Sequence, residues 1–150
     1  MYKLFIVLGC VVLASGCAIT RPVSELASQP KLTPCPWTPN CVSTEAKKNS
    51  QRIAPFKLAV DIEMAWPKIV NAVNALPGAS IKQKRTGYLY AKHHSKVFKF
   101  VDYLEVLHLP QQHHLAVRAS ARFGLSDFNV NRKRTETLRT ALIEQGVIHQ

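Results

Sequence analysis

Apolar and polar residues alternate most regularly between His114 and Arg122. Positions 115, 117, 119 and 121 are apolar, whereas Arg118, Ser120 and Arg122 each follow one of these apolar positions. This period of two predicts a β-strand with one face in the core of the protein. Thr86-Gly87 predicts a hairpin between two earlier strands, and a long apolar strand follows it. These three segments are Ser80–Arg85, Tyr88–His93 and Val97–Leu109.

The connection between the last two predicted strands sets their register. A tight turn at Gln111-Gln112 places Glu105 opposite Arg118 and Val101 opposite Arg122. That register pairs an acid with a base across the strands, and a shift of one residue would separate them. We therefore expect Glu105 and Arg118 to be neighbours.

Two segments have apolar residues at helical spacing. The first begins after Asp61, a suitable N-cap, and ends at Pro77-Gly78. Pro67 is expected in its first turn, because proline is tolerated there. The second helix is predicted from about Arg132 to Gln145, with Asn131 as its N-cap.

These elements predict an α+β fold in a single domain, which a chain of 150 residues is long enough to form. We expect a mainly antiparallel sheet of about four to five strands, with two helices packed on one face. Ile53–Leu58 contains a proline and fits an edge strand or an extended lead-in.

A disulfide-closed loop between Cys35 and Cys41 is expected to precede the sheet. The alternatives are a redox pair and half of a metal site. Redox pairs favour a gap of two residues, and no second thiol pair is present to complete a zinc site.

The N-terminus resembles a bacterial export signal. Leu4–Ala14 is apolar but much shorter than the roughly 20 residues that span a bilayer. Ala14-Ser15-Gly16-Cys17 then resembles the lipobox of lipoproteins. This resemblance implies removal of residues 1–16 and acylation of Cys17, which would anchor the chain firmly in a membrane. The alternative is an ordinary signal peptide cut nearby. Residues 17–33 are expected to be a flexible tether and residues 34–150 the folded domain.

The net charge of +11 and the isoelectric point near 9.8 indicate which partners the protein attracts and say little about its fold. A basic domain usually suggests nucleic acid, but an exported protein does not meet cytosolic nucleic acid. We expect anionic envelope lipid, glycan or an acidic protein instead. No aspartate follows Cys17. In a Gram-negative host, the expected location is therefore the outer membrane, facing the periplasm.

The first turn of the second helix carries three cations, Arg132, Lys133 and Arg134. Helix N-termini disfavour cations by roughly 0.3–1 kcal/mol each. Ion pairs with Asp127, or with the structural candidates Asp102 and Glu105, could offset the repulsion. A bound anion is the second explanation, and a solvated face is the third. The candidate residues for binding an anionic ligand are Arg118, Ser120, Arg122, Ser126, Asp127, Asn131 and Arg132.

The sequence contains no clear catalytic motif. Ser120, Asp127 and a histidine could form a triad, but no nucleophile-elbow sequence surrounds the serine. The adjacent pairs His93-His94 and His113-His114 point to opposite faces of a strand and are expected to be solvated strand ends. We expect no catalytic residue, metal or cofactor. The favoured function is a non-catalytic binding or assembly module with an arginine-rich anion-binding face. The alternative is a hydrolase or transferase acting on cell-envelope lipid or glycan.

Several spaced motifs resemble an uncharacterised bacterial family, domain of unknown function 1499. They are Cys-Pro-x-Thr-Pro-Asn-Cys-Val-Ser, Ile-x-Pro-Phe, Phe-x-Phe-Val-Asp-x-x-Glu and Val-Arg-x-Ser-x-Arg-x-Gly-x-Ser-Asp-x-x-Val-Asn-Arg. The resemblance extends roughly from Pro34 to Leu142. It implies an exported or membrane-attached protein and carries no established activity.

Three positions depart from the pattern of that family. Ala119 replaces a common serine, and Tyr103 stands where a second acid often follows Asp102. A mechanism based on that acid pair is therefore not expected. Asn129 replaces a common glycine, and asparagine is the residue that best tolerates positive φ. We predict a left-handed turn at Asn129.

Overall fold

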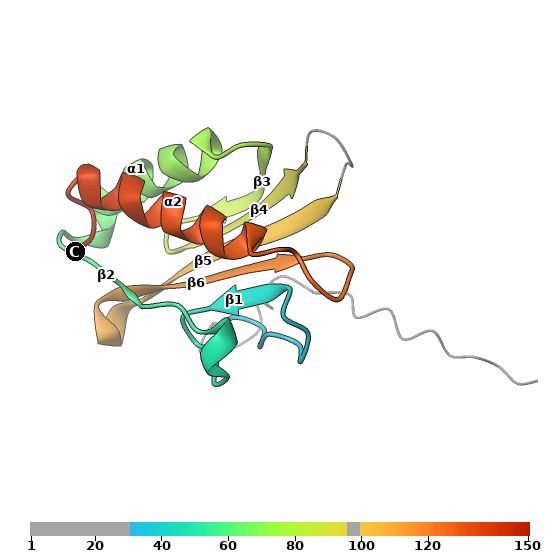
Figure 1. The fold of residues 1–150 in the computed structure, drawn as a ribbon. Coiled ribbons are helices and arrows are strands. Elements are labelled where there is room, and N and C mark those ends of the chain that lie inside the picture. The colour runs from blue at the N-terminus through green and yellow to red at the C-terminus, as the bar shows by residue number, and fades with distance from the viewer. Residues whose placement is uncertain (1–30, 96–99) are drawn as a thin grey trace, which may run out of the picture.

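The computed structural model describes residues 31–95 and 100–150, which form an antiparallel sheet with two helices on one face (Figure 1). The strands are β1 (Cys41–Ser43), β2 (Phe56–Lys57), β3 (Ala79–Arg85), β4 (Tyr88–His94), β5 (Val101–Leu109) and β6 (His114–Ala121). The helices are α1 (Ile62–Ala75) and α2 (Val130–Glu144), with short 3-10 turns η1 (Asn49–Gln51) and η2 (Pro110–Gln112). The predicted α+β fold is confirmed.

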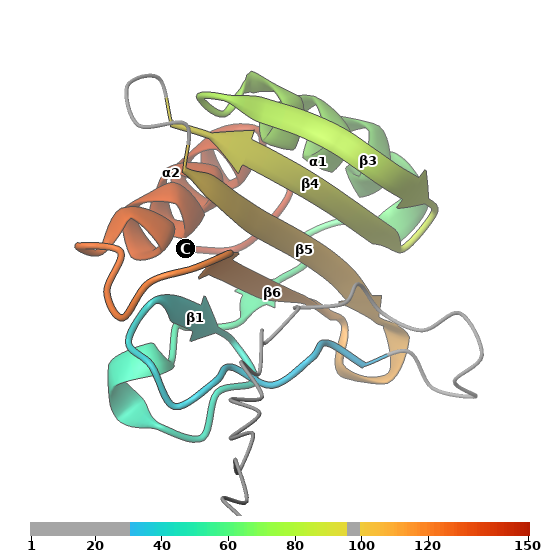
Figure 2. The same ribbon diagram turned by 90° about the vertical axis from the view of Figure 1, so that its right-hand side faces the viewer.

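The sheet has six strands, with the order β1-β6-β5-β4-β3 and with β2 also paired to β6 (Figure 2). The short β1 pairs with the end of β6, and β2 pairs with its beginning. Turn η2 joins β5 to β6 and sets Glu105 directly opposite Arg118, as predicted. The backbone N–H of Arg122 donates to the carbonyl of Val101 at 2.8 Å, which continues the same register.

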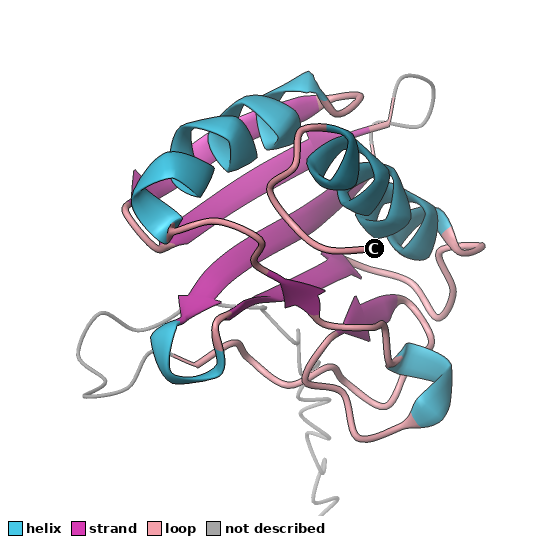
Figure 3. Cartoon of the chain, turned by 90° about the vertical axis from the view of Figure 1, so that its left-hand side faces the viewer, coloured by secondary structure: helices cyan, strands magenta, loops and turns pink. Residues whose placement is uncertain are grey.

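The main core lies between the sheet and the two helices, which cover one face of it (Figure 3). Alternate strand residues such as Leu104 and Val117 pack there against helix residues such as Ile69 and Leu138. The other residues of the central strands point to the opposite face. A second, smaller cluster lies on that face, made of Leu32, Tyr88, Tyr90, Tyr103, Leu107 and Ala116. The sheet therefore buries side chains on both sides.

The predicted N-cap of helix α1 agrees with the structure, but the expected place of Pro67 in that helix and the start of helix α2 do not. Helix α1 begins at Ile62, after the predicted N-cap Asp61, so Pro67 lies in its second turn rather than its first. At this position proline cannot donate the backbone hydrogen bond that other residues make to the carbonyl four residues earlier. Helix α2 begins at Val130, so the predicted N-cap at Asn131 is wrong. Residues 97–99 of the predicted strand lie outside the described residues.

The N-terminal part of the domain is closed by a disulfide. Cys35 and Cys41 are bonded with a Cα–Cα distance of 5.6 Å, as predicted. Leu32, which falls within the expected tether, is buried in the second cluster against the sheet. Within the two described ranges, neither helix has the length and apolar character needed to cross a bilayer.

Candidate functional site

Asp127 caps the start of helix α2. Its Oδ2 accepts a hydrogen bond from the backbone N–H of Asn131 at 2.8 Å, and its Oδ1 accepts from that of Asn129 at 3.2 Å. Phe128 and Asn129 adopt φ of 50° and 65°, which folds the chain back so that the carboxylate reaches the helix. The left-handed turn predicted at Asn129 is confirmed. The negative charge of Asp127 thus meets the positive end of the helix.

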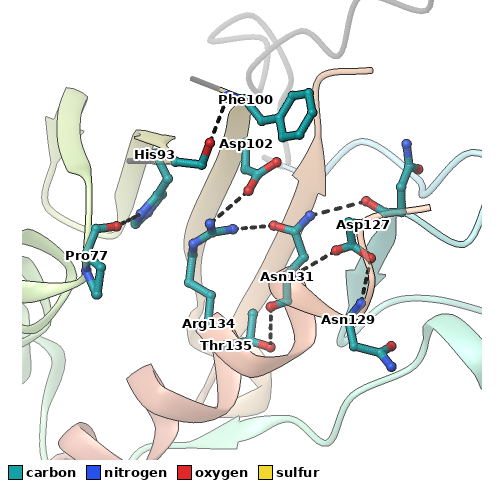
Figure 4. Close-up of polar contacts among 11 residues, drawn as sticks. Pro77, His93, Phe100, Asp102, Asp127, Asn129, Asn131, Arg134 and Thr135 are labelled. Carbon is teal, nitrogen blue, oxygen red and sulfur yellow. Dashed lines mark hydrogen bonds and ion pairs between the residues drawn. The ribbon is translucent and has the colours of Figure 1, made fainter. Parts of the chain in front are cut away.

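Arg134 connects α2 to the sheet (Figure 4). Its Nη2 lies 2.8 Å from Oδ2 of Asp102 on β5, and its Nη1 donates to the side-chain oxygen of Asn131. The amide nitrogen of Asn131 in turn donates to the backbone carbonyl of Asn40 at 3.4 Å. Asp102, a structural ion-pair candidate, is therefore paired. This chain of contacts ties the helix to β5 and to the loop before β1.

Arg132 points away from this chain of contacts, toward η1. It donates to the carbonyl of Ser50 at 2.7 Å and to that of Arg52 at 3.1 Å. Carbonyl oxygens and carboxylates within the protein therefore accept hydrogen bonds from two of the three cations at the helix start. Asp127 provides a further negative charge there. These contacts favour the internal explanation over a bound anion at the helix end.

His93 is fully buried beside this network, contrary to the expectation of a solvated strand end. It pairs in register with Asp102, and its Nδ1 lies 3.2 Å from the carbonyl oxygen of Pro77 (Figure 4). Burial, and then the charge of Arg134, lower the pKa of His93 from 6.5 to about 4. The imidazole is therefore neutral at physiological pH. His94, the next residue, is exposed as expected.

The opposite face of the sheet carries Arg118, Ser120 and Arg122. The Nη1 of Arg118 lies 3.3 Å from Oε2 of Glu105, and both side chains are almost completely buried. Ser120 is buried opposite Tyr103 of β5, two residues along the same face of β6. Arg122 is exposed just beyond the end of the strand. The predicted pairing of Glu105 is thus confirmed as a buried ion pair.

Tyrosine rings lie beside this ion pair. Tyr90 and Tyr103 stack with ring centroids 5.7 Å apart. Burial, and then the charges of Tyr103 and Glu105, raise the pKa of Tyr90 to about 12, although the charges of Arg118 and Arg122 oppose the rise. Burial also lowers the pKa of Arg118, and the charge of Glu105 counteracts that effect. These mutual influences place Arg118, Arg122, Glu105 and both tyrosines in one electrostatic environment.

Several donors in this cluster lack an acceptor among the described residues. They are the Nε and Nη2 groups of Arg118 and the hydroxyl of Ser120, all buried. Leaving a buried polar group unsatisfied costs about 1–3 kcal/mol. A guanidinium and a hydroxyl on one face form a donor set that suits the oxygens of a carboxylate or phosphate.

Comparison with known protein families identifies the family of this chain. A family model described as a protein of unknown function (DUF1499) matches residues 31–142. The chain belongs to the DUF1499 family. No curated protein has a sequence that matches it.

The candidate ligand residues of this DUF1499 domain fall into two groups. Arg118, Ser120 and Arg122 lie together on the face of the sheet away from the helices. The other four lie at or just before the start of α2. Ser126 accepts a hydrogen bond from the N–H of Phe128. Asp127, Asn131 and Arg132 make the contacts described above.

The positions of the two groups also bear on whether Ser120 and Asp127 could act together in catalysis. Ser120 faces away from the helices, while Asp127 binds the N–H groups of α2, so they do not form a catalytic pair. Across residues 31–95 and 100–150, no group of three His, Cys, Asp or Glu side chains could hold a metal ion. Two features of this region had no readable signal in the sequence, namely the burial of His93 and the stacking of Tyr90 on Tyr103.

Proposed function

We propose that this protein is a non-catalytic binding or assembly module of the cell envelope, anchored by lipid on Cys17. Arg118 and Ser120 hold an anionic group of its partner. The observation that carries the proposal is the buried guanidinium of Arg118, which uses Nη1 for Glu105 and leaves Nε and Nη2 without an acceptor among the described residues. The hydroxyl of Ser120, two residues along the same face of β6, likewise has no partner among them.

The energetics favour an acceptor at this position. Two guanidinium nitrogens and one hydroxyl are withdrawn from water without a partner among the described residues, and each unsatisfied group carries a penalty. A carboxylate, sulfate or phosphate oxygen would accept from these donors and remove the penalty. Arg122 adds an exposed positive charge at the end of the same face, which would attract an anion toward the pair.

The ligand class follows from the expected location. A lipidated Cys17 would keep the domain at a membrane surface of the envelope. Anionic lipid headgroups, acidic glycans and acidic protein segments all present the oxygens that the donors of Arg118 require. The net charge of +11 favours each of them over neutral partners.

The direct test is a calorimetric titration of the purified protein, once with inorganic phosphate and once with glycerol phosphate. Ser120→Ala removes one donor without changing any charge, and Arg122→Ala removes the attracting charge. Both should weaken binding. Arg132→Ala is the matched control, because its guanidinium binds the carbonyls of Ser50 and Arg52 instead. Equal affinity in Ser120→Ala and the unaltered protein would exclude the proposed site.

The alternative is a hydrolase or transferase acting on cell-envelope lipid or glycan. It would use Ser120 as a nucleophile, and the carboxylate of Asp127, in the loop before α2, is engaged with backbone N–H groups at the helix start instead. Incubation with envelope lipids and glycans tests this alternative. Retention without product supports the binding module, whereas product that disappears in Ser120→Ala would establish the enzyme.

A further inference from the structure

The loop between β6 and α2 displays large apolar side chains to solvent. Phe123 is 67 % exposed, Leu125 is 70 % exposed and Phe128 is 86 % exposed. Val130, at the first position of α2, is 45 % exposed. Single exposed apolar residues are common, but several in one short loop are characteristic of an interaction surface.

The backbone of this loop is held in place, so the exposure of these side chains is built into the fold. The hydroxyl of Ser126 accepts from the N–H of Phe128 at 3.2 Å, and Asp127 binds the next turn. The carbonyl of Gly124 accepts from the side chain of Asn40. Phe128 itself adopts φ of 50°, a conformation that is unfavourable for a bulky residue. The protein thus maintains a strained backbone that directs an aromatic ring into solvent.

A second exposed aromatic residue lies in the adjacent loop. Trp37 is 78 % exposed and lies three residues before Asn40. The side chain of Asn40 joins the two loops by its hydrogen bond to the carbonyl of Gly124. Both loops lie at one end of the molecule, where β6 ends and α2 begins (Figure 1). Tryptophan is enriched where a protein meets the headgroup region of a bilayer, because its ring is apolar and its N–H is polar.

Positive charge accompanies these apolar residues. The guanidinium of Arg122 lies 4.9 Å from the ring centroid of Phe123, and Lys133 is exposed in the first turn of α2. The acid of the loop, Asp127, is engaged with backbone N–H groups of the helix. Apolar side chains surrounded by cations are complementary to a surface of anionic lipid.

We propose that the loop from Arg122 to Val130 is a membrane-contact edge. Phe123, Leu125 and Phe128 enter the boundary between headgroups and acyl chains of an anionic bilayer. Arg122 and Lys133 contact the headgroup phosphates. The contact is separate from the lipid on Cys17. It shares Arg122 with the proposed ligand site but uses neither Arg118 nor Ser120, so it can orient the domain whichever ligand the sheet binds.

The test must report on the loop alone, because a lipid on Cys17 would by itself bring the full chain to any vesicle. Phe128→Trp places a fluorescent reporter in the loop, and Met64→Trp places the same reporter on α1, where Met64 is 60 % exposed. Both variants are made with Trp37→Phe in the full-length chain. They then share the same background from Trp66, which is buried in the core.

The proteins are reconstituted in vesicles of equal parts phosphatidylglycerol and phosphatidylethanolamine with brominated acyl chains. Bromine quenches tryptophan only on close approach, so Phe128→Trp should lose most of its reporter fluorescence and Met64→Trp should keep it. Adding Leu125→Asp to Phe128→Trp should restore the emission, and brominated phosphatidylcholine alone should quench less. Equal quenching of the two reporters, or none in either, would overturn the proposal.

A contact between copies of the chain is the competing occupant of this loop. It would shield the Phe128→Trp reporter from iodide in the absence of lipid, increasingly with protein concentration. That result would also overturn the proposal. Failure of either kind leaves the phosphate titration of the Arg118 site unaffected, so the two proposals are tested separately.

Discussion

Glu105 and Arg118 face each other across β5 and β6, and at most 2 % of either side chain is exposed to solvent. Their ion pair is accompanied by the hydroxyl of Tyr88, which donates to Oε1 of Glu105 at 3.0 Å. In a buried ion pair each charge offsets the desolvation cost of the other, so removing one partner leaves an uncompensated charge in the core. This relationship determines how the second face of the sheet responds to mutation.

Removing both members of the pair should cost less stability than the sum of the losses from removing each one alone. Arg118→Met or Glu105→Gln alone should lower the free energy of unfolding by about 3–5 kcal/mol. The double variant should lose less than the sum of the single losses, because no uncompensated charge remains. Urea denaturation of the four proteins measures the coupling. Losses that simply add would show that the two charges do not interact.

His93 should make stability depend on pH below neutrality. Its pKa is lowered to about 4 in the folded protein, so unfolding takes up a proton between pH 4 and the unfolded value of 6.5. The stabilisation is complete above pH 6.5 and is lost as pH falls toward 4. The loss should be roughly 2–4 kcal/mol, since one pKa unit corresponds to about 1.4 kcal/mol. Denaturation at several pH values measures this slope.

His93→Gln is the control for that slope, because glutamine can still donate a hydrogen bond toward the carbonyl of Pro77 but cannot titrate. Burial also lowers the pKa of His108, and the charge of His113 adds to that effect. His108 therefore contributes to the slope of both proteins, and the difference between the slopes isolates His93. Identical slopes would mean that His93 is not held neutral.

The positive φ at Asn129 should be visible in stability. Asn129→Gly should leave the free energy of unfolding unchanged or slightly higher, because glycine adopts this conformation freely. Asn129→Val should lower it by about 1–2 kcal/mol, because its branched side chain clashes in the left-handed region. Thermal unfolding of the two variants compares them. A valine variant as stable as the glycine variant would contradict this conformation.

The disulfide should stabilise the domain by restricting the unfolded chain. Cys35 and Cys41 are six positions apart, and closing so short a loop contributes about 2 kcal/mol in the chain-entropy model. Cys35→Ser with Cys41→Ser should lower the stability by that amount. Reducing agent should have the same effect on the unaltered protein and none on the variant, which serves as the control.

Periodicity was sufficient to predict the central strands and their register. The alternation from 114 to 122 and the short turn before it placed Glu105 against Arg118, and the structure agrees. Strand β1 was missed because three residues carry no readable period. It exists because Val42 pairs with Ala119 and fills the core beneath the helices.

The start of α2 could not be predicted from local capping rules alone. Asn131 has the right residue type for an N-cap, but Asp127 reaches the helix from four residues earlier. It does so because Phe128 and Asn129 both take positive φ. The burial of His93 was also hidden, because alternation shows which residues share a face but not that both faces are covered.

Two of the candidate ligand residues, Arg118 and Arg132, contact different parts of the protein, and the alternating pattern of β6 explains why. Helix α2 packs its apolar stripe on the apolar positions of β6, such as Val117 and Ala119. Arg118 points to the other side of the same strand. A helix that covers the apolar positions therefore lies away from the intervening arginine.

Among the described strands, β3 ends the sheet on the side opposite β1, and it carries Lys82, Lys84 and Arg85. If two molecules joined their β3 strands side by side, these cations would be brought close together. Repulsion of this kind disfavours the growth of a sheet from one molecule into the next. Even where many copies are crowded on a surface, this repulsion would thus keep their sheets from joining edge to edge through β3.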